Sequence, residues 1–318
     1  MKQIYLCENG QNIKNVYGVD DRVYSKAQVL ADPEGFRDTR FIFSTWGMPV
    51  FTEAEIRSCF PALEAVFYGA GTVQSFARSF LNCGVKVFSA WAANAVPVAE
   101  YTVAQIILAN KGFFKSMRYT DRAAVKQEFA HFPGNYNVKV GIIGAGMIGK
   151  LVIGKLKEYR LDVLVFDPFL PDEKAAELGV EKVSLERLFR ECQVVSNHLA
   201  NNEQTKGMLK GAHFAAMLPY ATFINTGRGA QVVEQELIDT LKARPDLMAI
   251  LDVTFPEPPV PDSPLYTLPN CILTPHIAGS SGQEVRRMGA YMVAEYENYV
   301  HGKTTQYEVT AEMLKTMA

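Results

Sequence analysis

The stretch Val138-Lys-Val-Gly-Ile-Ile-Gly-Ala-Gly-Met-Ile-Gly149, near the middle of the chain, decides the fold. It begins as a buried strand, turns at a glycine-rich segment and continues as the start of a helix. Gly144, Gly146 and Gly149 give the spacing G-x-G-x-x-G, which lets a backbone turn tightly, approach a pyrophosphate and pack a helix against the strand. The spacing alone is a weak signal, because a glycine turn between a strand and a helix often binds nothing.

The strand that follows supplies a second signal. Residues 161–166 are a predicted buried strand that leads into Asp167, 18 residues beyond Gly149. An acidic residue near this distance accepts hydrogen bonds from the ribose hydroxyls of a dinucleotide and repels a 2′-phosphate. The combination predicts a dinucleotide site that favours NAD over NADP, whereas Asp167 alone is equally a solvated residue after a strand.

The composition sets the limits. The chain of 318 residues is long enough for about two domains. Its net charge of −2 gives no reason to expect nucleic acid or an anionic membrane as a partner. The N-terminus has no apolar signal core, and no segment is expected to be long enough to cross a bilayer. Five cysteines, odd in number and never in C-x-x-C pairs, favour reduced thiols in a cytoplasmic protein.

Short apolar runs alternate with amphipathic runs along the chain, which predicts parallel sheets covered by helices. In the first 96 residues, strands are predicted at 2–7, 40–45, 63–68 and 85–89, and helices at 52–60 and 73–82. From residue 138, predicted strands at 138–143, 161–166, 194–199, 221–225, 248–253 and 271–273 alternate with helices at 147–159, 185–192, 214–218 and 232–243. About six parallel strands with helices between them make a doubly wound domain.

The remaining segments connect these halves. The longest helical pattern runs over 97–118, with Pro97 in its first turn and Glu100 complementing the helix dipole. It is apolar over more than one face, which is typical of a helix buried between domains or at a subunit contact. Three further segments are predicted: a polar connector at 121–137, a proline-rich loop without regular structure at 255–269, and a helix at 281–299 that returns the chain to the first domain.

Three polar side chains follow strands of the second half, where ligands of such sheets bind: Arg228, Glu257 and His276. Arg228 offers a planar fork suited to a carboxylate. His276 is of the residue type that exchanges a proton near neutral pH, and Glu257 can bond its other ring nitrogen and fix the tautomer. Singly, they are equally an ion-paired arginine, a solvated glutamate and a turn-capping histidine. Together on a dinucleotide scaffold they favour a catalytic site, with no competing metal cluster or nucleophile elbow.

The turn Gly69-Ala-Gly71 has two interpretations. It is either a turn that needs positive φ, or a loop whose amides, ahead of a helix, hold a carboxylate. Taken from its own residues, the simpler turn is favoured.

Four motifs then follow one another: Gly141-Ile-Ile-Gly-Ala-Gly-Met-Ile-Gly149, Asn225-Thr-Gly-Arg-Gly229, Asp252-Val-Thr-Phe-Pro-Glu-Pro258 and Thr274-Pro-His-Ile-Ala-Gly279. With the weaker Gly69-Ala-Gly71 and Asn94-Ala-Val-Pro-Val-Ala-Glu100, they resemble the D-isomer-specific 2-hydroxyacid dehydrogenases over nearly the whole chain. The resemblance implies an NAD-binding, Rossmann-type doubly wound domain of residues 97–281. It also implies a smaller, flavodoxin-like α/β substrate domain of residues 1–96 and 282–318, and a homodimer joined along the cofactor domains.

The resemblance also implies roles for single residues in a reaction between NAD(H) and a small D-2-hydroxy acid or 2-keto acid. Arg228 would bind the substrate, Glu257 would orient the histidine, and His276 would be the acid/base. The positions expected to line the NAD site are Gly144, Gly146, Met147, Ile148, Gly149, Asp167, Thr226, Gly227 and Asp252. Ala70 and Gly71 match the backbone that holds the substrate carboxylate, which reverses the simpler interpretation of that turn.

The chain departs from the family pattern in places. Val73 stands where an aspartate is common, His198-Leu-Ala-Asn-Asn202 replaces His-x-Pro-Leu-Thr with Asn201 in one wall, and the connector before Val138 is short. These departures leave the substrate open. So does a set of apolar side chains that are as suited to a core as to a pocket: Trp46, Met48, Tyr68 and Trp91.

Two alternatives to the dehydrogenase remain. One is an NAD(H)-sensing, corepressor-like module that keeps the scaffold and recognises a partner, against which the intact Arg228, Glu257 and His276 argue. The other is a formate dehydrogenase, but those enzymes pair the histidine with glutamine, and this chain has Glu257.

Overall fold

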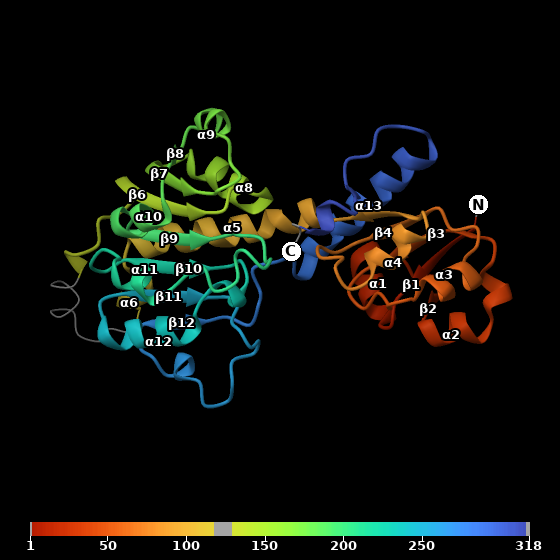
Figure 1. Ribbon diagram of the computed structural model, residues 1–318, viewed down its shortest axis with the longest axis horizontal. Helices are drawn as coiled ribbons and strands as arrows, with labels where there is room; N and C mark the ends of the chain where they lie inside the picture. The colour runs from red at the N-terminus through yellow and green to blue at the C-terminus, as the bar shows by residue number, and fades with distance from the viewer. Residues whose placement is uncertain (1, 118–128, 316–318) are drawn as a thin grey trace. The chain divides into compact units, whose positions relative to one another are not determined.

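The computed structural model describes residues 2–117 and 129–315. The chain divides into two compact units, Met1–Asn94 with Ser280–Ala318, and Ala95–Gly279. Each unit holds its own sheet (Figure 1). The side chains on both faces of each sheet are buried. Position 118, the predicted helix end, and residues 121–128 of the predicted connector over 121–137 fall outside the described residues. The long helix itself ends earlier than predicted, at Asn110.

The sheet of the second unit has seven parallel strands in the order β12-β11-β10-β9-β6-β7-β8. Its strands are β6 (Tyr136–Ile143), β7 (Arg160–Phe166), β8 (Glu181–Lys182), β9 (Val194–Asn197), β10 (Thr222–Asn225), β11 (Met248–Leu251) and β12 (Cys271–Leu273). Counted from β6, this is the Rossmann order 3-2-1-4-5-6 with a seventh strand added. The predicted doubly wound sheet is confirmed, and the strand order reverses between β6 and β9.

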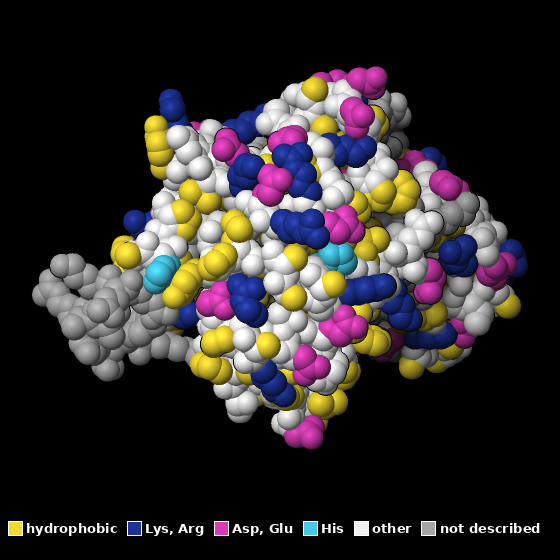
Figure 2. Space-filling view, turned by 60° about the vertical axis from the view of Figure 1, so that its left-hand side comes forward, with side chains coloured by type: hydrophobic (Ala, Val, Ile, Leu, Met, Phe, Trp, Pro, Cys, Tyr) yellow, Lys and Arg dark blue, Asp and Glu magenta, His cyan; other side chains and the backbone are white. Residues whose placement is uncertain are grey.

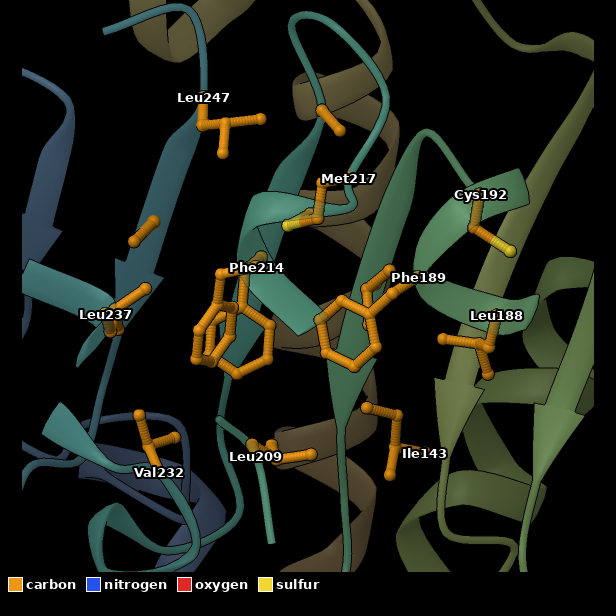
Figure 3. Packing of buried hydrophobic residues seen from close by; sticks show 14 of the residues in the cluster. Ile143, Leu188, Phe189, Cys192, Leu209, Phe214, Met217, Val232, Leu237 and Leu247 are labelled. Atoms are coloured by element: carbon orange, nitrogen blue, oxygen red, sulfur yellow. The ribbon is translucent and has the colours of Figure 1, made fainter. Parts of the chain in front are cut away.

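Successive residues of these strands point to opposite faces, and both faces are buried. One core cluster contains Ile143, Val195 and Phe223, and the cluster on the other face contains their chain neighbours Ile142, Val194 and Ile224. Figure 3 shows the first cluster, in which Phe189 and Phe214 meet edge to face with ring centroids 5.6 Å apart. A strand buried on both faces reads as a continuous apolar run, which is why the sequence revealed these strands.

The helices of the second unit are α6 (Phe113–Ser116), α8 (Met147–Leu156), α9 (Asp172–Leu178), α10 (Leu185–Glu191), α11 (Gly211–Ala215) and α12 (Glu234–Ala243). Local chemistry fixes several of their ends. Ser184 caps α10 by accepting a hydrogen bond from the Arg187 amide, and Gly179 ends α9 at a positive φ of 71°. The proline-rich loop is not wholly irregular as predicted, since Pro264–Tyr266 forms a 3-10 turn with Pro264 in its first turn.

The long helix α5 (Trp91–Asn110) begins six residues earlier than predicted. Pro97 therefore lies inside the helix, and Glu100 lies in its middle, where it pairs with Lys155 at 3.1 Å instead of complementing the helix dipole. The alanine-rich residues before Pro97 have high helix propensity, so the helix extends back past the proline. Gly112, at φ 66°, separates α5 from α6.

By length and composition alone, α5 is the one helix of the described chain that is suited to spanning a membrane. The expectation that no segment is long enough is therefore wrong. More than half of the apolar stretch is buried inside the protein, and Val103 and Ile106 belong to a core cluster with strands β6 and β10. This burial is that of a core helix.

The first unit has a six-stranded sheet in the order β13-β5-β4-β3-β1-β2. Its strands are β1 (Lys2–Leu6), β2 (Val23–Tyr24), β3 (Thr39–Ser44), β4 (Ala65–Tyr68), β5 (Lys86–Ser89) and β13 (Glu308–Val309). Five parallel strands in the order 2-1-3-4-5 make a flavodoxin-like sheet, and β13 adds an antiparallel edge beside β5. The predicted flavodoxin-like domain is confirmed in fold.

The helices of the first unit are α1 (Gly10–Tyr17), α2 (Lys26–Ala31), α3 (Glu53–Cys59), α4 (Ala77–Asn82) and α13 (Val285–Val300). Thr52 and Glu55 form a capping box at the start of α3, which begins one residue after the predicted start at Thr52. The predicted helix over 73–82 begins later, at Ala77. The sequence prediction missed α1, β2, α2, α9, β8 and β13, which are short or lie in polar stretches.

Candidate active site

The glycine turn between β6 and α8 has the geometry of an anion site. Gly144 sits at φ 89°, and a Cβ there would lie 2.9 Å from the His198 carbonyl group. A Cβ at Gly149 would lie 2.0 Å from the Gly144 oxygen, so the helix packs directly on the turn. Gly146 faces open space and gives α8 no side-chain cap, which leaves the first amides of the helix available to a phosphate. Met147 is exposed and Ile148 half-buried at this helix start.

Asp167 lies at the end of β7, beside the turn. Its Oδ2 accepts a hydrogen bond of 2.7 Å from the Ala145 amide, and its Oδ1 accepts one of 2.8 Å from the Phe169 amide. Each carboxylate oxygen keeps a lone pair for a further donor. The half-buried carboxylate is thus fixed next to the glycine turn in a position suited to ribose hydroxyls.

Arg228 follows the end of β10, after Thr226 and Gly227. Its Nη1 donates to the Gly227 carbonyl at 2.8 Å, and no carboxylate of residues 2–117 or 129–315 forms an ion pair with it. Burial lowers the pKa of the guanidinium, and the negative charge of Glu257 opposes that shift. The fork is partly desolvated without a carboxylate partner, a state that favours binding an anionic ligand.

His276 and Glu257 meet beyond the ends of β12 and β11. Nδ1 of His276 lies 2.6 Å from Oε1 of Glu257, and both side chains are about half exposed. A carboxylate only accepts, so Nδ1 carries the proton of this bond and Nε2 is free to give or take one. The charge of Glu257 also acts on Arg228, where it opposes the lowering of the pKa by burial. All three predicted catalytic residues follow the neighbouring strands β10, β11 and β12.

The loop that carries His276 is held by Asp252. His276 is a non-glycine residue at φ 55°, in the left-handed region, and its amide donates to the Asp252 carbonyl at 3.1 Å. The buried Asp252 carboxylate accepts from Thr274 Oγ1 at 2.6 Å and from the amides of Ile277 and Ala278 at 2.9 Å. The resemblance implies a place for Asp252 in the cofactor lining, and in the structure its carboxylate fixes the loop of His276.

His198, noted from the sequence only in its motif, is a second histidine at a strand end. It is buried, with Nε2 3.0 Å from Ser196 Oγ and Nδ1 3.3 Å from Thr226 Oγ1. Burial lowers its pKa to about 3, so the ring is neutral. Thr226 Oγ1 also lies 3.2 Å from Thr102 Oγ1, which ties α5 to the predicted cofactor lining.

In the first unit, the Gly69-Ala-Gly71 turn follows β4. Neither glycine has a positive φ, so the interpretation that the turn requires one is wrong. Ser89 Oγ donates to the carbonyls of Ala70 (2.9 Å) and Gly71 (2.6 Å), whereas no acceptor in the described chain bonds the amides of these two residues. The amide of the partly exposed Gly71 is therefore available to a carboxylate, whereas Ala70 is fully buried.

The apolar candidates for a substrate pocket separate clearly. Met48 and Tyr68 are buried in the core, and Trp91 packs edge to face on Tyr307. Val73, the departure from aspartate, is also a core residue. Trp46, just after β3, is 40% exposed and is the most exposed member of the set.

Within the part of the chain that the structure describes, no group of three or more His, Cys, Asp and Glu side chains could hold a metal ion. The five cysteines are free, and all but Cys83 are buried.

The Rossmann strand order, the open glycine turn and Asp167 define a dinucleotide-binding α/β protein. Residues 103–278, more than half of the chain, match the family model "D-isomer specific 2-hydroxyacid dehydrogenase, NAD binding domain". The chain belongs to the D-isomer specific 2-hydroxyacid dehydrogenase family, as its motifs implied.

Curated relatives agree. D-3-phosphoglycerate dehydrogenase of Archaeoglobus fulgidus is 30% identical over 221 residues, which cover 69% of this chain and 42% of the relative. The enzyme of that name from Methanocaldococcus jannaschii is 30% identical over 251 residues, which cover 73% and 48%. The chain thus spans about half the length of the curated relatives that it matches.

Solved structures share the fold of both units. The D-mandelate dehydrogenase of Rhodotorula graminis superposes with a TM-score of 0.77 at 19% identity, covering 97% of each chain. The NAD-complexed D-isomer specific 2-hydroxyacid dehydrogenase of Lactobacillus delbrueckii ssp. bulgaricus gives 0.77 at 18% identity, covering 97% of this chain and all of the other. At these identities the likeness concerns the fold alone.

Proposed function

We propose that the protein is an NAD-dependent oxidoreductase that interconverts a small 2-keto acid and the D-2-hydroxy acid. The observation that carries the proposal is the 2.6 Å contact of His276 Nδ1 with Glu257 Oε1, which leaves Nε2 free to donate a proton. Family membership and the anion-binding geometry at Gly146 support the cofactor. In this proposal residues 97–281 bind NAD, and residues 1–96 with 282–318 bind the substrate.

The chemistry divides among a few groups. NADH, when bound, supplies the hydride to the keto carbon. His276 donates its Nε2 proton to the carbonyl oxygen, and Glu257 accepts Nδ1–H and stabilises the imidazolium that precedes the transfer. Arg228 binds the substrate carboxylate with its fork. Ala70 and Gly71 of the first unit are the substrate-binding backbone positions that the resemblance implies. The other proposed NAD-lining positions are those named from the resemblance.

The test is NADH oxidation with a panel of 2-keto acids that differ in side-chain size and charge, run in parallel with NADPH. We expect turnover of at least one small 2-keto acid and a preference for NADH, since the Asp167 carboxylate repels a 2′-phosphate. Binding of NADH without turnover of any member would instead favour a sensor. NAD reduction by formate would favour a formate dehydrogenase.

The partner proposal is a homodimer through the cofactor domains. Three exposed apolar side chains at the end of α5 and in and after α6 support it: Leu108, Phe113 and Met117. Light scattering after gel filtration should give twice the mass of the chain, and a Met117→Asp variant should shift that mass towards one copy.

The proposal includes neither nucleic acid nor membrane as a partner. On the face shown in Figure 2, Lys and Arg side chains are interspersed with Asp and Glu instead of forming one basic patch. The five free cysteines support a cytoplasmic location, where thiols stay reduced.

A further inference from the structure

Three buried amide side chains lie together at the ends of β9 and β10: Asn197, Asn225 and Gln231. Their exposed fractions are 0%, 1% and 0%. Asn197 and Asn225 are paired across the two strands, and Gln231 ends the 3-10 turn Gly229–Gln231. A buried amide requires partners, so three together indicate a fixed network.

Gln231 uses its whole hydrogen-bonding capacity. Its Oε1 accepts from the Arg228 amide at 3.1 Å and from Asn197 Nδ2 at 2.6 Å. Its Nε2 donates to the carbonyls of Leu199 (2.8 Å) and Ala200 (3.0 Å). The side chain thus joins the loop after β9 to the loop that carries Arg228.

The orientation of Gln231 follows from its partners. The Arg228 amide and Asn197 Nδ2 are both donors, and the Leu199 and Ala200 carbonyls are both acceptors. A flipped amide would set donors against donors and acceptors against acceptors, so only one orientation satisfies the network.

Asn197 and Asn225 complete the support under the turn. Asn225 Oδ1 accepts from Asn197 Nδ2 at 3.0 Å and from the Gly227 amide at 3.1 Å, and Asn225 Nδ2 donates to the Arg228 carbonyl at 3.3 Å. A Cβ at Gly227 would lie 2.9 Å from both Asn197 Nδ2 and Gln231 Oε1. The backbone therefore rests directly on the amides.

We propose that Gln231 is a positioning residue that sets the backbone, and hence the guanidinium fork, of Arg228. The inference rests on the proposed function in taking Arg228 as the group that binds the substrate carboxylate. The Nη1 bond to the Gly227 carbonyl extends the same support to the guanidinium, since that carbonyl belongs to the turn that the network holds. A shift of the turn moves the fork out of bidentate geometry.

The main variant is Gln231→Met, which keeps the length of the side chain and removes all four hydrogen bonds. We expect the KM for the preferred 2-keto acid to rise about tenfold or more, which corresponds to the loss of one to two hydrogen bonds in the substrate complex. The affinity for NADH should stay within about twofold of the parent. Gln235→Met is the matched control, because Gln235 is exposed on α12 and bonds only Asp239. Equal effects of the two substitutions would overturn the proposal.

Gln231→Glu separates the bond that positions the Arg228 backbone from the bonds to the loop after β9. It is the variant to measure if Gln231→Met does not fold. A glutamate at this buried position takes up a proton, so it keeps a carbonyl acceptor for the Arg228 amide and donates one O–H to the Leu199 or Ala200 carbonyl in place of two N–H groups. We expect its KM to stay within about threefold of the parent. A KM raised about tenfold or more in Gln231→Glu would show that Gln231 acts through the loop after β9, against the proposal.

Two further measurements distinguish this proposal from the proposed function. In an Arg228→Ala background, Gln231→Met should add less than about twofold to KM, because its target is gone; full additivity would overturn the proposal. If the parent protein turns over no 2-keto acid, the proposed function fails, and amide hydrogen exchange decides the network. Exchange at Gly227 and Arg228 should then rise about tenfold or more in Gln231→Met and stay unchanged in Gln235→Met, and an increase absent or spread evenly over the unit would overturn it.

Discussion

Two histidines of the same sheet sit at strand ends in opposite environments. His276, after β12, is about half exposed and bonds a carboxylate through Nδ1. His198, after β9, is buried among hydroxyls, and its pKa is lowered to about 3. The residue type is the same, but of the two rings only that of His276 has a carboxylate partner and a second nitrogen that no described residue bonds. Environment, and not the presence of an imidazole, determines which histidine can transfer a proton.

The largest expected effect on turnover comes from removing the His276 ring. His276→Ala should lower kcat by a factor of about 10² to 10⁴, the usual contribution of a positioned acid, while NADH binding and thermal stability stay near those of the parent. Stopped-flow kinetics measure kcat, and fluorescence titration measures NADH binding. His301→Ala, at an exposed histidine of α13's end, is the control, and unchanged turnover in His276→Ala would refute the catalytic role.

The same comparison extends to Arg228, the group proposed to bind the substrate carboxylate. Arg228→Ala should raise the KM for the 2-keto acid about a hundredfold, since a desolvated guanidinium makes charge-assisted bonds to a carboxylate. Arg228→Lys should recover part of the loss, because an ammonium keeps the charge but not the fork. A KM and kcat equal to those of the parent in both variants would remove Arg228 from the substrate site.

The buried ring of His198 should affect the pH dependence of the free energy of unfolding and not the chemical step. Above about pH 6.5 His198 is neutral in both folded and unfolded chains; below it, only the unfolded chain takes up the proton. Stability should therefore fall as pH falls, by about 2 kcal/mol between pH 7 and pH 5 from this residue.

Urea unfolding at several pH values measures that slope. His198→Asn should flatten it, whatever the change in absolute stability, and His301→Asn should leave it as it is. An unaltered slope in His198→Asn would mean that the folded protein accommodates a protonated ring at this position.

The sequence predicted the open site better than the buried network, and the reason is physical. Strand ends of a parallel sheet share one edge, so Arg228, Glu257 and His276 could be grouped from strand positions alone. The contacts of Asn197, Asn225 and Gln231 have no such signal, because a buried amide leaves no periodic pattern and its partners are backbone groups of other loops. The contacts by which Asp252 holds the His276 loop could not be predicted from the sequence for the same reason.

The fold shows the same division. Apolar strands buried on both faces were predicted almost to the residue, as at β10 and β12. The start of α5 was misplaced because Pro97 is well suited to a first turn, although the residues before it continue the helix. The two-residue strand β13 pairs with β5 from the far end of the chain, and a contact of that kind depends on the folded sheet and not on local propensity.

The smallest expected effect comes from removing the negative charge of Glu257, which His276 has as a partner and His198 lacks. Glu257→Gln keeps an acceptor for Nδ1–H and removes the negative charge that stabilises the imidazolium. We expect kcat to fall about tenfold with an unchanged KM, the difference between a charge-assisted and a neutral hydrogen bond. Glu297→Gln is the matched control, because Glu297 lies 3.5 Å from the exposed His301. If Glu257→Gln left kcat at the parent value, Glu257 would serve only to orient the ring, and the open nitrogen alone would distinguish His276 from His198.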